Sequence, residues 1–490
     1  MGYSPEGMEL IPPPLDSNEA LPPIAAHGEI AASLLDFEAT KVVRRLHQHG
    51  HQAYFVGGCV RDLLLNRKPK DFDIATSATP EEVRSIFRNC RLIGRRFRLA
   101  HVYFRGGKVV EVATFRANPT ELEVDEGPPE EPEVPILLEE GEGEGEGGIE
   151  GDSEAIPSPV ADVFITQDNV FGTAEQDARR RDFTINGLFY DVVEGRVIDY
   201  VRGRRDLELR QIRTIGDAEV RLREDPVRLL RAVRFAAKLD FDIESRTYAA
   251  MEGAVEDLPR CAPARLLEET FRLIRSPAAS ASLKLLQALG ALETLLPTIF
   301  NYFRDHGVEA EKKFYAFAEA LDRKVATSER LPEDALLLAT LLAPIAQASP
   351  AKEIDPEQGG RPIVSEPVDR MLAELVEKAR LTRRVAERCR TILLAQKTLS
   401  GQRRSRRPLI HFRRHPLFAE SLQVFELSVE ATGEHREALE HWQQGGAPLV
   451  KSGAAGPRRR RKPRSRKVGV EESAGVVVAE VETSVMTPIR

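Results

Sequence analysis

The sequence predicts an α+β fold, in which a mixed sheet with flanking helices is followed by an all-α neck and body and by a basic disordered tail. Three short apolar segments indicate strands, and two of them alternate with the period of two that strands show: 53–56, 99–104 and 109–115. From about residue 246 to residue 396 the pattern is helical throughout, with short breaks at prolines: Pro263, Pro277, Pro297 and Pro344.

The composition sets the broad class of protein. The chain has 490 residues, of which 42% are hydrophobic and 30% charged, enough for two to four domains with a sizeable core. The cysteines are scattered without C-x-x-C spacing, so neither a disulfide framework nor a zinc site is indicated: Cys59, Cys90, Cys261 and Cys389. No signal peptide is recognised, and the longest apolar run, 335–343, is too short to cross a bilayer. We therefore expect a cytoplasmic location.

The stretch 53–76 organises the predicted head. It reads as an apolar strand, a turn at Gly57 and Gly58, a brief helix, and a second strand that carries Asp71 and Asp73. Carboxylates two residues apart on a strand point to the same side, and such a pair can hold a divalent metal ion. The glycines allow a close approach of the backbone, and the following helix offers N–H groups to a phosphate. Each feature alone is also typical of a solvated edge or a simple turn, but their order indicates phosphate chemistry.

The neighbouring segments supply the remaining elements of the first half. An amphipathic pattern over 30–50 predicts a helix that covers one face of the sheet. Thr79 and Glu82 fit a capping box that opens another helix. Gly106 and Gly107 then join the strands 99–104 and 109–115 in a tight turn.

An acidic segment of low complexity interrupts the head at about 119–160. It is rich in Pro, Gly and Glu, so it cannot bury enough apolar surface to fold alone. Its GEGEGEGG run is not a phosphate loop, because no strand precedes it and its glutamates would repel phosphate. We interpret the segment as a disordered insert. Whether it also inhibits the protein by imitating RNA stays open.

Two arginine-rich blocks follow the insert. Arg180, Arg181 and Asp182 are predicted to lead a helix, before a hairpin at 189–200, with an inward-facing apolar set: Phe183, Ile185 and Leu188. Farther on, Asp225 and Pro226 fit a helix start, and two arginines lie three residues apart on one helix face: Arg228 and Arg231. A carboxylate and an arginine at such an offset can read one base edge, or can form an ordinary salt bridge of about 0.2–0.5 kcal/mol.

Two basic tracts lie near the C-terminus. Residues 401–416 interleave arginines with Phe412 and two histidines, and 457–467 reads PRRRRKPRSRK. Cationic side chains make salt-sensitive contacts with phosphates, and aromatic rings can stack on single-stranded bases. A solvated tail is the alternative interpretation. We predict RNA-binding segments with these contact residues: Arg403, Arg404, Arg406, Arg407, Arg413, Arg414, Arg458, Arg459, Arg460 and Arg461.

The ordered series of motifs over about 34–297 resembles the class II nucleotidyltransferases of the DNA polymerase β superfamily, which comprise CCA-adding enzymes and bacterial poly(A) polymerases. The GG-x-x-RD turn, the D-x-D pair, the RRDFTIN block and the E-D-x-x-R block occur in the family's order. The stretch 92–102, LIGRRFRLAHV, looks like the one that marks the bacterial poly(A) polymerase I branch. The long acidic insert is a departure from the family.

The resemblance implies a polymerase-β-like head and a set of site residues. It assigns two Mg²⁺ ions to Asp71, Asp73 and Glu111, although Glu111 would otherwise pass for an exposed strand residue. It also implies that the glycine turn and Arg61 hold the triphosphate, while Asp225 and Arg228 read adenine. The full set of implied nucleotide-binding residues is Gly57, Gly58, Arg61, Asp62, Arg181, Asp182, Asp225, Arg228 and Arg231.

The implied activity is template-independent transfer of AMP from ATP to RNA 3′ ends. The expected partners are ATP, single-stranded RNA 3′ ends and proteins of RNA decay, without a membrane. A CCA-adding tRNA nucleotidyltransferase is the nearer alternative, and an RNA-binding homologue that has lost activity is the other. Intact Asp71, Asp73 and Glu111 argue against lost activity.

The same resemblance and the composition predict six successive regions. They are a disordered leader (1–28), a catalytic head (29–200), a neck that recognises the base (201–265), a helical body (266–400), an RNA-binding region (401–450) and the basic tail (451–490).

Overall fold

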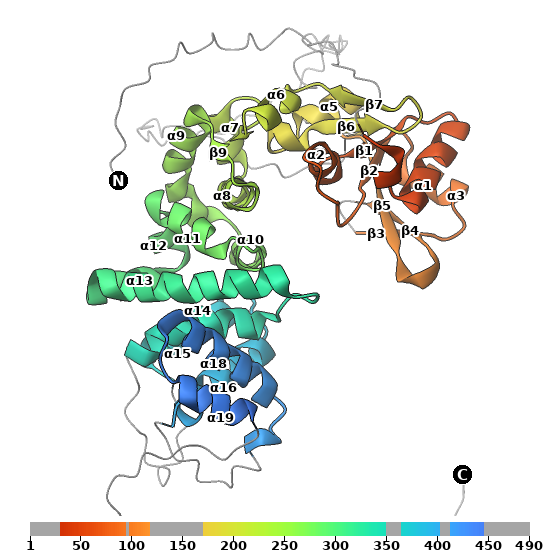
Figure 1. The fold of residues 1–490 in the computed structure, drawn as a ribbon. Coiled ribbons are helices and arrows are strands. Elements are labelled where there is room, and N and C mark those ends of the chain that lie inside the picture. Colours follow the sequence, from red (N-terminus) through yellow and green to blue (C-terminus); the bar gives the residue numbers. More distant parts are fainter. Residues whose placement is uncertain (1–29, 95–97, 118–169, 349–363, 402–411, 445–490) are drawn as a thin grey trace, which may run out of the picture. The chain divides into compact units, whose positions relative to one another are not determined.

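The computed structural model describes residues 30–94, 98–117, 170–348, 364–401 and 412–444, shown as coloured ribbon in Figure 1. The predicted leader, the acidic insert and the basic tail lie outside the described residues. Within the described residues no helix is both long enough and apolar enough to span a membrane.

A seven-stranded mixed sheet forms the centre of the head (Figure 1). Its strand order is β3-β4-β5-β2-β1-β6-β7, and β2 pairs in parallel with β5 while the other neighbours are antiparallel. The strands are β1 (Ala53–Val56), β2 (Ile74–Thr76), β3 (Cys90–Ile93), β4 (Leu99–Tyr103), β5 (Val109–Thr114), β6 (Leu188–Asp191) and β7 (Arg196–Asp199). The predicted mixed sheet is thus confirmed.

Short helices flank the sheet: α1 (Phe37–Gln48), α2 (Gly58–Leu64), α3 (Pro80–Ile86) and α5 (Ala174–Arg179), with 3₁₀ turns at Ala32–Leu34, Arg105–Gly107 and Thr184–Asn186. The amphipathic helix starts later than the predicted 30–50, because the Asp36 carboxylate caps it by accepting from the N–H groups of Glu38 and Ala39. The predicted capping box of α3 is confirmed, with Glu82 N–H donating to Thr79 Oγ1 and Thr79 N–H to Glu82 Oε2.

The two faces of the sheet have different coverings. On one face, apolar side chains of α1 and α3 pack against residues of β1, β2, β4 and β5 in the large core. On the other face, α5 packs over β1, β6 and the end of β5, and a smaller core holds Tyr54, Phe115 and Phe189. Strands β3 and β4 contribute no side chain to this smaller core. Their outward side chains therefore stay available at that face.

The structure corrects three predictions in the head. Strand β2 begins at Ile74, so Asp71 and Asp73 lie in the loop just before it rather than on it. Strand β3 was not predicted, since its alternation is between half-buried and exposed positions only. The helix α5 ends at Arg179, and the block that follows is a 3₁₀ turn and a strand. Its apolar residues are nevertheless buried as predicted: Phe183, Ile185 and Leu188.

The neck region is mostly helical: α6 (Gly203–Glu208), α7 (Ala218–Glu224), α8 (Val227–Leu239), α9 (Ser245–Ala254) and a 3₁₀ helix at Val255–Arg260. It also holds a two-stranded parallel sheet of β8 (Gln211–Ile212) and β9 (Asp242–Ile243), which the all-α prediction for this region did not include.

The remaining described residues are helical: α10 (Pro263–Ile274), α11 (Ala279–Ala288), α12 (Ala291–Leu295), α13 (Pro297–Thr327), α14 (Asp334–Ala348), α15 (Glu366–Glu377), α16 (Arg383–Leu399), α18 (Phe418–Thr432) and α19 (Arg436–Gln443). The predicted break at Pro344 is wrong, because α14 continues through this residue. Every residue from Ala335 to Ala346 is buried, so packing on all sides holds the helix across the proline.

The two ends of the segment 118–169 are joined at its base. Ala117 N–H donates to the carbonyl of Val170 at 2.9 Å, and Gly172 N–H donates to the carbonyl of Phe115 at 3.0 Å. Arg116 and Phe171 form an antiparallel bridge between them. The chain therefore leaves the sheet and returns to it at one place.

Candidate nucleotidyltransferase site

Two of the three predicted metal-binding carboxylates, Asp73 and Glu111, come together where the loop before β2 meets β5. Asp73 is held beside β1, because its carbonyl accepts a hydrogen bond from Val56 N–H at 3.0 Å. Strand β2 runs parallel to β5 with Ile74 beside Val112, and one residue earlier this register sets Asp73 beside Glu111. Side chains of paired residues point to the same face, so the carboxylates of Asp73 and Glu111 share a face. Asp71 lies in the loop two residues earlier, near enough for its charge to act on Asp73.

The charges of these carboxylates influence one another. Desolvation by surrounding protein raises the pKa of Asp73, the negative charge of Glu111 raises it further, Arg181 lowers it, and Asp71 adds a smaller increase. Among the described residues, no three His, Cys, Asp or Glu side chains converge closely enough to form a closed metal site. The donor set itself, three carboxylates around a shared negative potential, matches the oxygen ligands that Mg²⁺ prefers.

Glu111 has a neighbour that the sequence did not indicate. His101 lies directly opposite it on β4, and His101 Nε2 is 3.5 Å from Glu111 Oε1. About half of the Glu111 side chain is exposed. The Glu111 carboxylate therefore lies beside the His101 ring and stays accessible from solvent.

The glycine turn lies beside this group. Gly57 has φ +72° and ψ −128°, a backbone conformation that only glycine adopts readily, and its N–H donates to the carbonyl of Leu188. A Cβ at this position would be 3.0 Å from Arg181 Nη1. Arg181 is held by Asp177 Oδ2, at 2.8 Å, and lies over the Phe189 ring. Its guanidinium thus lies beside the turn and within electrostatic reach of Asp73.

Four predicted nucleotide-binding residues form one buried network. Arg61 Nη1 donates to Asn186 Oδ1 at 2.7 Å, and its Nε and Nη2 donate to Asp62 Oδ1. Asn186 in turn donates to Asp182 Oδ1 at 3.0 Å, and Arg231 donates to Asp182 Oδ2 through Nε and Nη2. The network ties the glycine turn to helix α8.

The predicted base-reading pair is arranged differently from expectation. The Asp225 carboxylate accepts from Arg265 Nη2 at 2.6 Å and from Val227 N–H, so it caps the start of α8. The Arg228 guanidinium is buried and donates to the carbonyl of Arg221 and to Glu224 Oε2. Their side chains are not bonded to each other: the salt bridge of Arg228 goes to Glu224.

Of the predicted RNA-binding arginines, only Arg413 and Arg414 lie among the described residues. Arg414 is exposed, whereas Arg413 is half-buried and donates to the carbonyl of Trp442. Phe412, predicted as a stacking platform for RNA, packs edge-on against Phe418 and Trp442. The ring is half-buried against a small core that contains Trp442, so its stacking on RNA stays a prediction.

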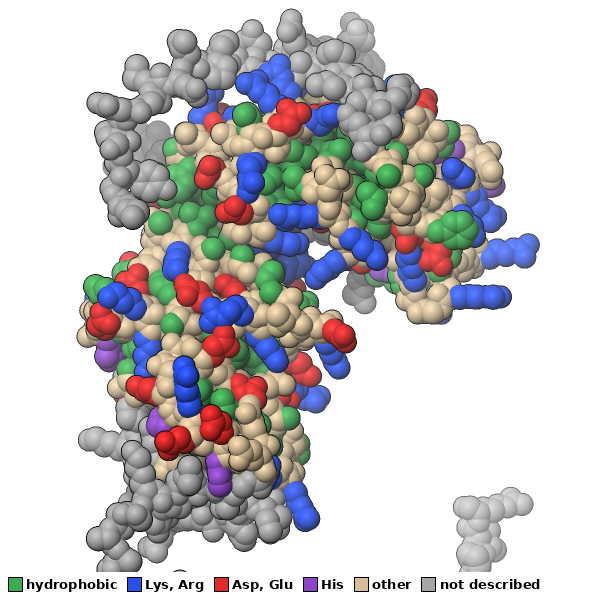
Figure 2. Space-filling model, in the orientation of Figure 1, with side chains coloured by type: hydrophobic (Ala, Val, Ile, Leu, Met, Phe, Trp, Pro, Cys, Tyr) green, Lys and Arg blue, Asp and Glu red, His purple; other side chains and the backbone are tan. Residues whose placement is uncertain are grey.

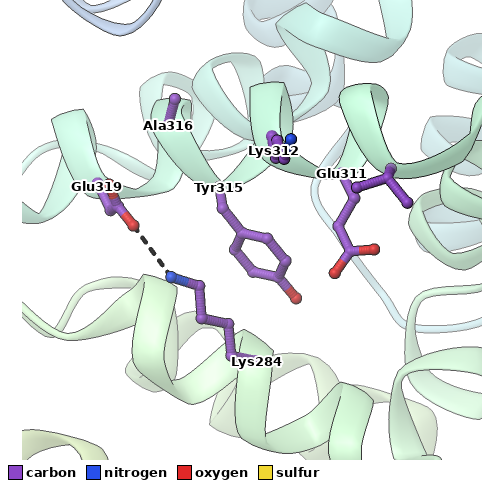
Figure 3. Close-up of a pocket in the computed structure, with 7 residues that line it drawn as sticks. Lys284, Glu311, Lys312, Tyr315, Ala316 and Glu319 are labelled. Atoms are coloured by element: carbon purple, nitrogen blue, oxygen red, sulfur yellow. Dashed lines mark hydrogen bonds and ion pairs between the residues drawn. The ribbon is translucent and has the colours of Figure 1, made fainter. Parts of the chain in front are cut away.

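A surface cavity of about 350 Å³ lies between α11 and α13 (Figure 3). Figure 3 shows Lys284 paired with Glu319, and the Tyr315 ring between the two helices. None of the predicted site residues lines this cavity. It is therefore no part of the candidate site.

Sequence reasoning missed several residues that position the site. Asn186 and Asp177 hold the predicted arginines, Glu224 holds Arg228, and His101 faces Glu111. Asn186 and Glu224 fall inside the quoted motifs, so the sequence carried a signal for both. The strand register alone brings His101 to Glu111, and no motif marks it.

Comparisons with known proteins identify the family of the head and of the region that follows it. A family profile described as the poly(A) polymerase head domain matches residues 53–213, and one described as a probable RNA- and SrmB-binding site of polymerase A matches residues 240–303.

Individual relatives fall into two groups of activity. Poly(A) polymerase I of Salmonella typhimurium is 36% identical over 443 residues, which cover 87% of this chain and 88% of the relative. The CCA-adding enzyme of Geobacillus thermodenitrificans is 35% identical over 260 residues, 53% of this chain and 54% of the relative. The crystal structure of the Bacillus stearothermophilus CCA-adding enzyme with CTP matches with a TM-score of 0.55 and 26% identity, covering 83% of this chain and 81% of the other. By identity and coverage, the chain belongs to the poly(A) polymerase I family of nucleotidyltransferases.

Proposed function

We propose that this protein is a template-independent polynucleotide adenylyltransferase, which adds AMP from ATP to the 3′ ends of RNA. The observation that carries the proposal is the register of β2 and β5, which sets Asp73 beside Glu111 next to the Gly57 turn. The family membership and the relatives named poly(A) polymerase I support adenylate addition over CCA addition.

Asp71, Asp73 and Glu111 would hold two Mg²⁺ ions, since three carboxylates near one another create a negative site that a divalent ion neutralises. Bound there, such ions would activate the RNA 3′-hydroxyl and stabilise the departing pyrophosphate.

The chain's own residues would position the nucleotide. The backbone of Gly57 and Gly58 allows the triphosphate to approach closely, and Arg181, beside the turn, supplies a cation for it. Arg61 would support the glycine turn rather than reach past it, because its guanidinium donates a hydrogen bond to Asn186. Asp225 and Arg228 would read adenine from the start of α8, with Glu224 fixing the guanidinium. Positioning and electrostatics supply the rate, since phosphoryl transfer requires no covalent intermediate with the protein.

The test is nucleotide addition by the purified chain with Mg²⁺, each nucleoside triphosphate in turn, and either a generic oligoribonucleotide or a tRNA without its CCA end. We expect a long ladder with ATP on the generic RNA. Addition that stops after a few nucleotides and requires CTP and tRNA would make the protein a CCA-adding enzyme. No addition with any nucleotide, together with intact RNA binding, would identify an inactive homologue.

The expected cytoplasmic location and the expected proteins of RNA decay belong to the same proposal. ATP and RNA 3′ ends, the substrates proposed here, are available in the cytoplasm. Recovery of RNA-decay proteins with the tagged chain, compared with a chain ending at residue 450, would test the partners.

A further inference from the structure

A row of polar side chains crosses the sheet from the carboxylates to its edge. Glu111 on β5 pairs with His101 on β4, and His101 pairs with Arg91 on β3. In the neighbouring row, Val109 on β5 pairs with Tyr103 on β4. Because paired residues point to the same face, all four of these neighbours of Glu111 share the face of Asp73. We call Arg91, His101, Tyr103 and Val109 the β3–β5 platform.

The platform is an exposed surface. The alternate residues of the same strands point to the other face and are buried in the core: Ala100, Val102, Val110 and Val112. Arg91 and Val109 are exposed, while His101 and Tyr103 are half-buried. Figure 2 shows Lys and Arg side chains projecting around the region of β3, β4 and β5, with acidic side chains among them.

A hollow of about 520 Å³ borders the platform. It is lined by Arg88, Asn89, Cys90, Arg91 and Tyr103. The Arg91 guanidinium lies over the Tyr103 ring at 5.5 Å, and the Tyr103 and His101 rings are 6.4 Å apart. Two guanidinium groups and a half-buried tyrosine ring suit a nucleotide, whose phosphate pairs with arginine and whose base stacks on aromatic rings.

The order of strands indicates whether this nucleotide is the incoming ATP or part of the RNA. The Gly57 turn follows β1, the carboxylates lie at β2 and β5, and the platform lies at β4 and β3. The platform and the glycine turn are therefore on opposite sides of the carboxylates within the sheet. In phosphoryl transfer the attacking and leaving oxygens are roughly in line on opposite sides of the phosphorus. If the pyrophosphate leaves from the α-phosphorus on the glycine side, the attacking 3′-hydroxyl comes from the platform side.

We propose that the β3–β5 platform binds the 3′-terminal nucleotides of the RNA primer, with Arg91 contacting a backbone phosphate and Tyr103 stacking on a base. This inference rests on the proposed function, because it takes the carboxylates as the place of transfer. Arg91 and Tyr103 are positioning residues for the RNA.

The first test measures KM for a short primer and KM for ATP separately in Arg91→Ala and Tyr103→Ala. A tetranucleotide primer confines binding to the site. We expect the KM for the primer to rise about tenfold in each variant, with the KM for ATP within about twofold of wild type. Arg91→Ala should also reduce the slope of log affinity against log salt by about 0.7, whereas Tyr103→Ala should not.

Two variants serve as matched controls. Arg84→Ala removes an exposed arginine from α3, which packs on the opposite face of the same strands, and should leave both KM values unchanged. Tyr103→Phe keeps the ring and should retain primer affinity. Primer KM values unchanged in both Arg91→Ala and Tyr103→Ala, or an equal rise in the KM for ATP, would overturn the platform.

A second measurement uses the unaltered chain. A primer with 4-thiouridine next to its 3′ nucleotide should crosslink on irradiation to a peptide within 89–105, which includes Tyr103. Crosslinking confined to other peptides would contradict the platform. If wild type and Arg84→Ala extend no RNA with ATP, the proposed function is refuted. If both extend RNA but the primer KM of Arg91→Ala and Tyr103→Ala equals that of wild type, only the proposed primer site is refuted.

Discussion

Asp73 is the residue on which the proposed chemistry depends most. Its side chain is exposed, but surrounding protein and the charges of Glu111 and Asp71 raise the pKa of its carboxyl. A carboxylate kept among like charges is stable only if a cation compensates them, and Arg181 compensates in part. The Asp73 carboxylate therefore serves the proposed chemistry without adding to the free energy of unfolding.

The first prediction concerns the loss of this charge. Asp71→Ala or Asp73→Ala should abolish nucleotide addition, while the free energy of unfolding changes by less than about 0.5 kcal/mol, because both side chains are exposed. Asp242→Ala, on the exposed side of β9, is the control and should retain activity. Substantial turnover in either site variant would refute the metal assignment.

The second prediction separates two costs at Gly57. Gly57→Ala forces an unfavourable backbone conformation and also brings a Cβ to 3.0 Å from Arg181 Nη1, so we expect a loss of about 3 kcal/mol in unfolding free energy together with a loss of activity. Gly50→Ala, at φ +83° with nothing within 4 Å, should cost about 1–2 kcal/mol and retain activity. Chemical denaturation and primer extension measure both. Full activity in Gly57→Ala would rule out the close approach of a triphosphate.

The elements show how far sequence patterns reach. The capping box of α3, the strand β1 and the hairpin around Gly106 all follow from local chemistry, and all are present. The D-x-D pair lies outside β2 because strand pairing, which depends on partners far along the chain, ends at Ile74.

The sequence motifs proposed the candidate site residues, but they did not predict the contacts that these residues make. Asp225 and Arg228 were expected to face one base edge together, yet Arg265, forty residues later, takes the Asp225 carboxylate. Glu224 takes Arg228 by ordinary helical spacing. Long-range partners such as Arg265 and His101 are fixed by the fold, so no local pattern announces them.

The third prediction concerns the network that joins α8 to the head. Burial alone would raise the pKa of Asp182, but Arg231, Asn186 and the Phe183 N–H together hold it below its usual value. A lowered pKa gives stability that is present above the unfolded value of about 3.9 and is lost as the pH falls through the folded value. Unfolding free energy should therefore decline below about pH 4.

Asp182→Asn tests this network directly. It breaks a buried pair, so we expect a loss of about 3 kcal/mol at pH 7 and a shallower decline toward low pH. Asp240→Asn, in an exposed pair with Arg210, should change neither. Denaturant titrations from pH 3 to pH 8 supply the measurement. Parallel pH curves for wild type and Asp182→Asn would contradict the assignment.

Over the whole chain, the net charge of −7 averages an acidic segment and a basic segment that lie far apart in the sequence. The run 457–467 carries eight Lys and Arg residues, and the acidic insert lies in the first third of the chain, at about 119–160. Both lie outside the described residues, so their roles stay predictions from composition.

The fourth prediction concerns the basic tail. A chain that ends at residue 450 should bind a long oligoribonucleotide about tenfold or more weakly, and its affinity should depend less steeply on salt. The KM for a tetranucleotide primer should stay unchanged, because the proposed platform lies in the head. Replacement of the eight cations by glutamine should reproduce the truncation. Equal affinity for long RNA of wild type, the truncated chain and the glutamine variant would show that the tail does not contribute to RNA binding.

The joined base of the segment 118–169 has a consequence for engineering and for evolution. Gly172 lies so close to Ala117 that a Cβ would be 2.8 Å from the Ala117 nitrogen, and the flanking hydrogen bonds hold the two strands of chain together. The segment between Ala117 and Gly172 can be lengthened, shortened or exchanged at little entropic cost, because the entropy of loop closure depends only weakly on loop length. The position between these anchors is therefore a suitable insertion site for a fluorescent or affinity domain, which would leave the carboxylates undisturbed.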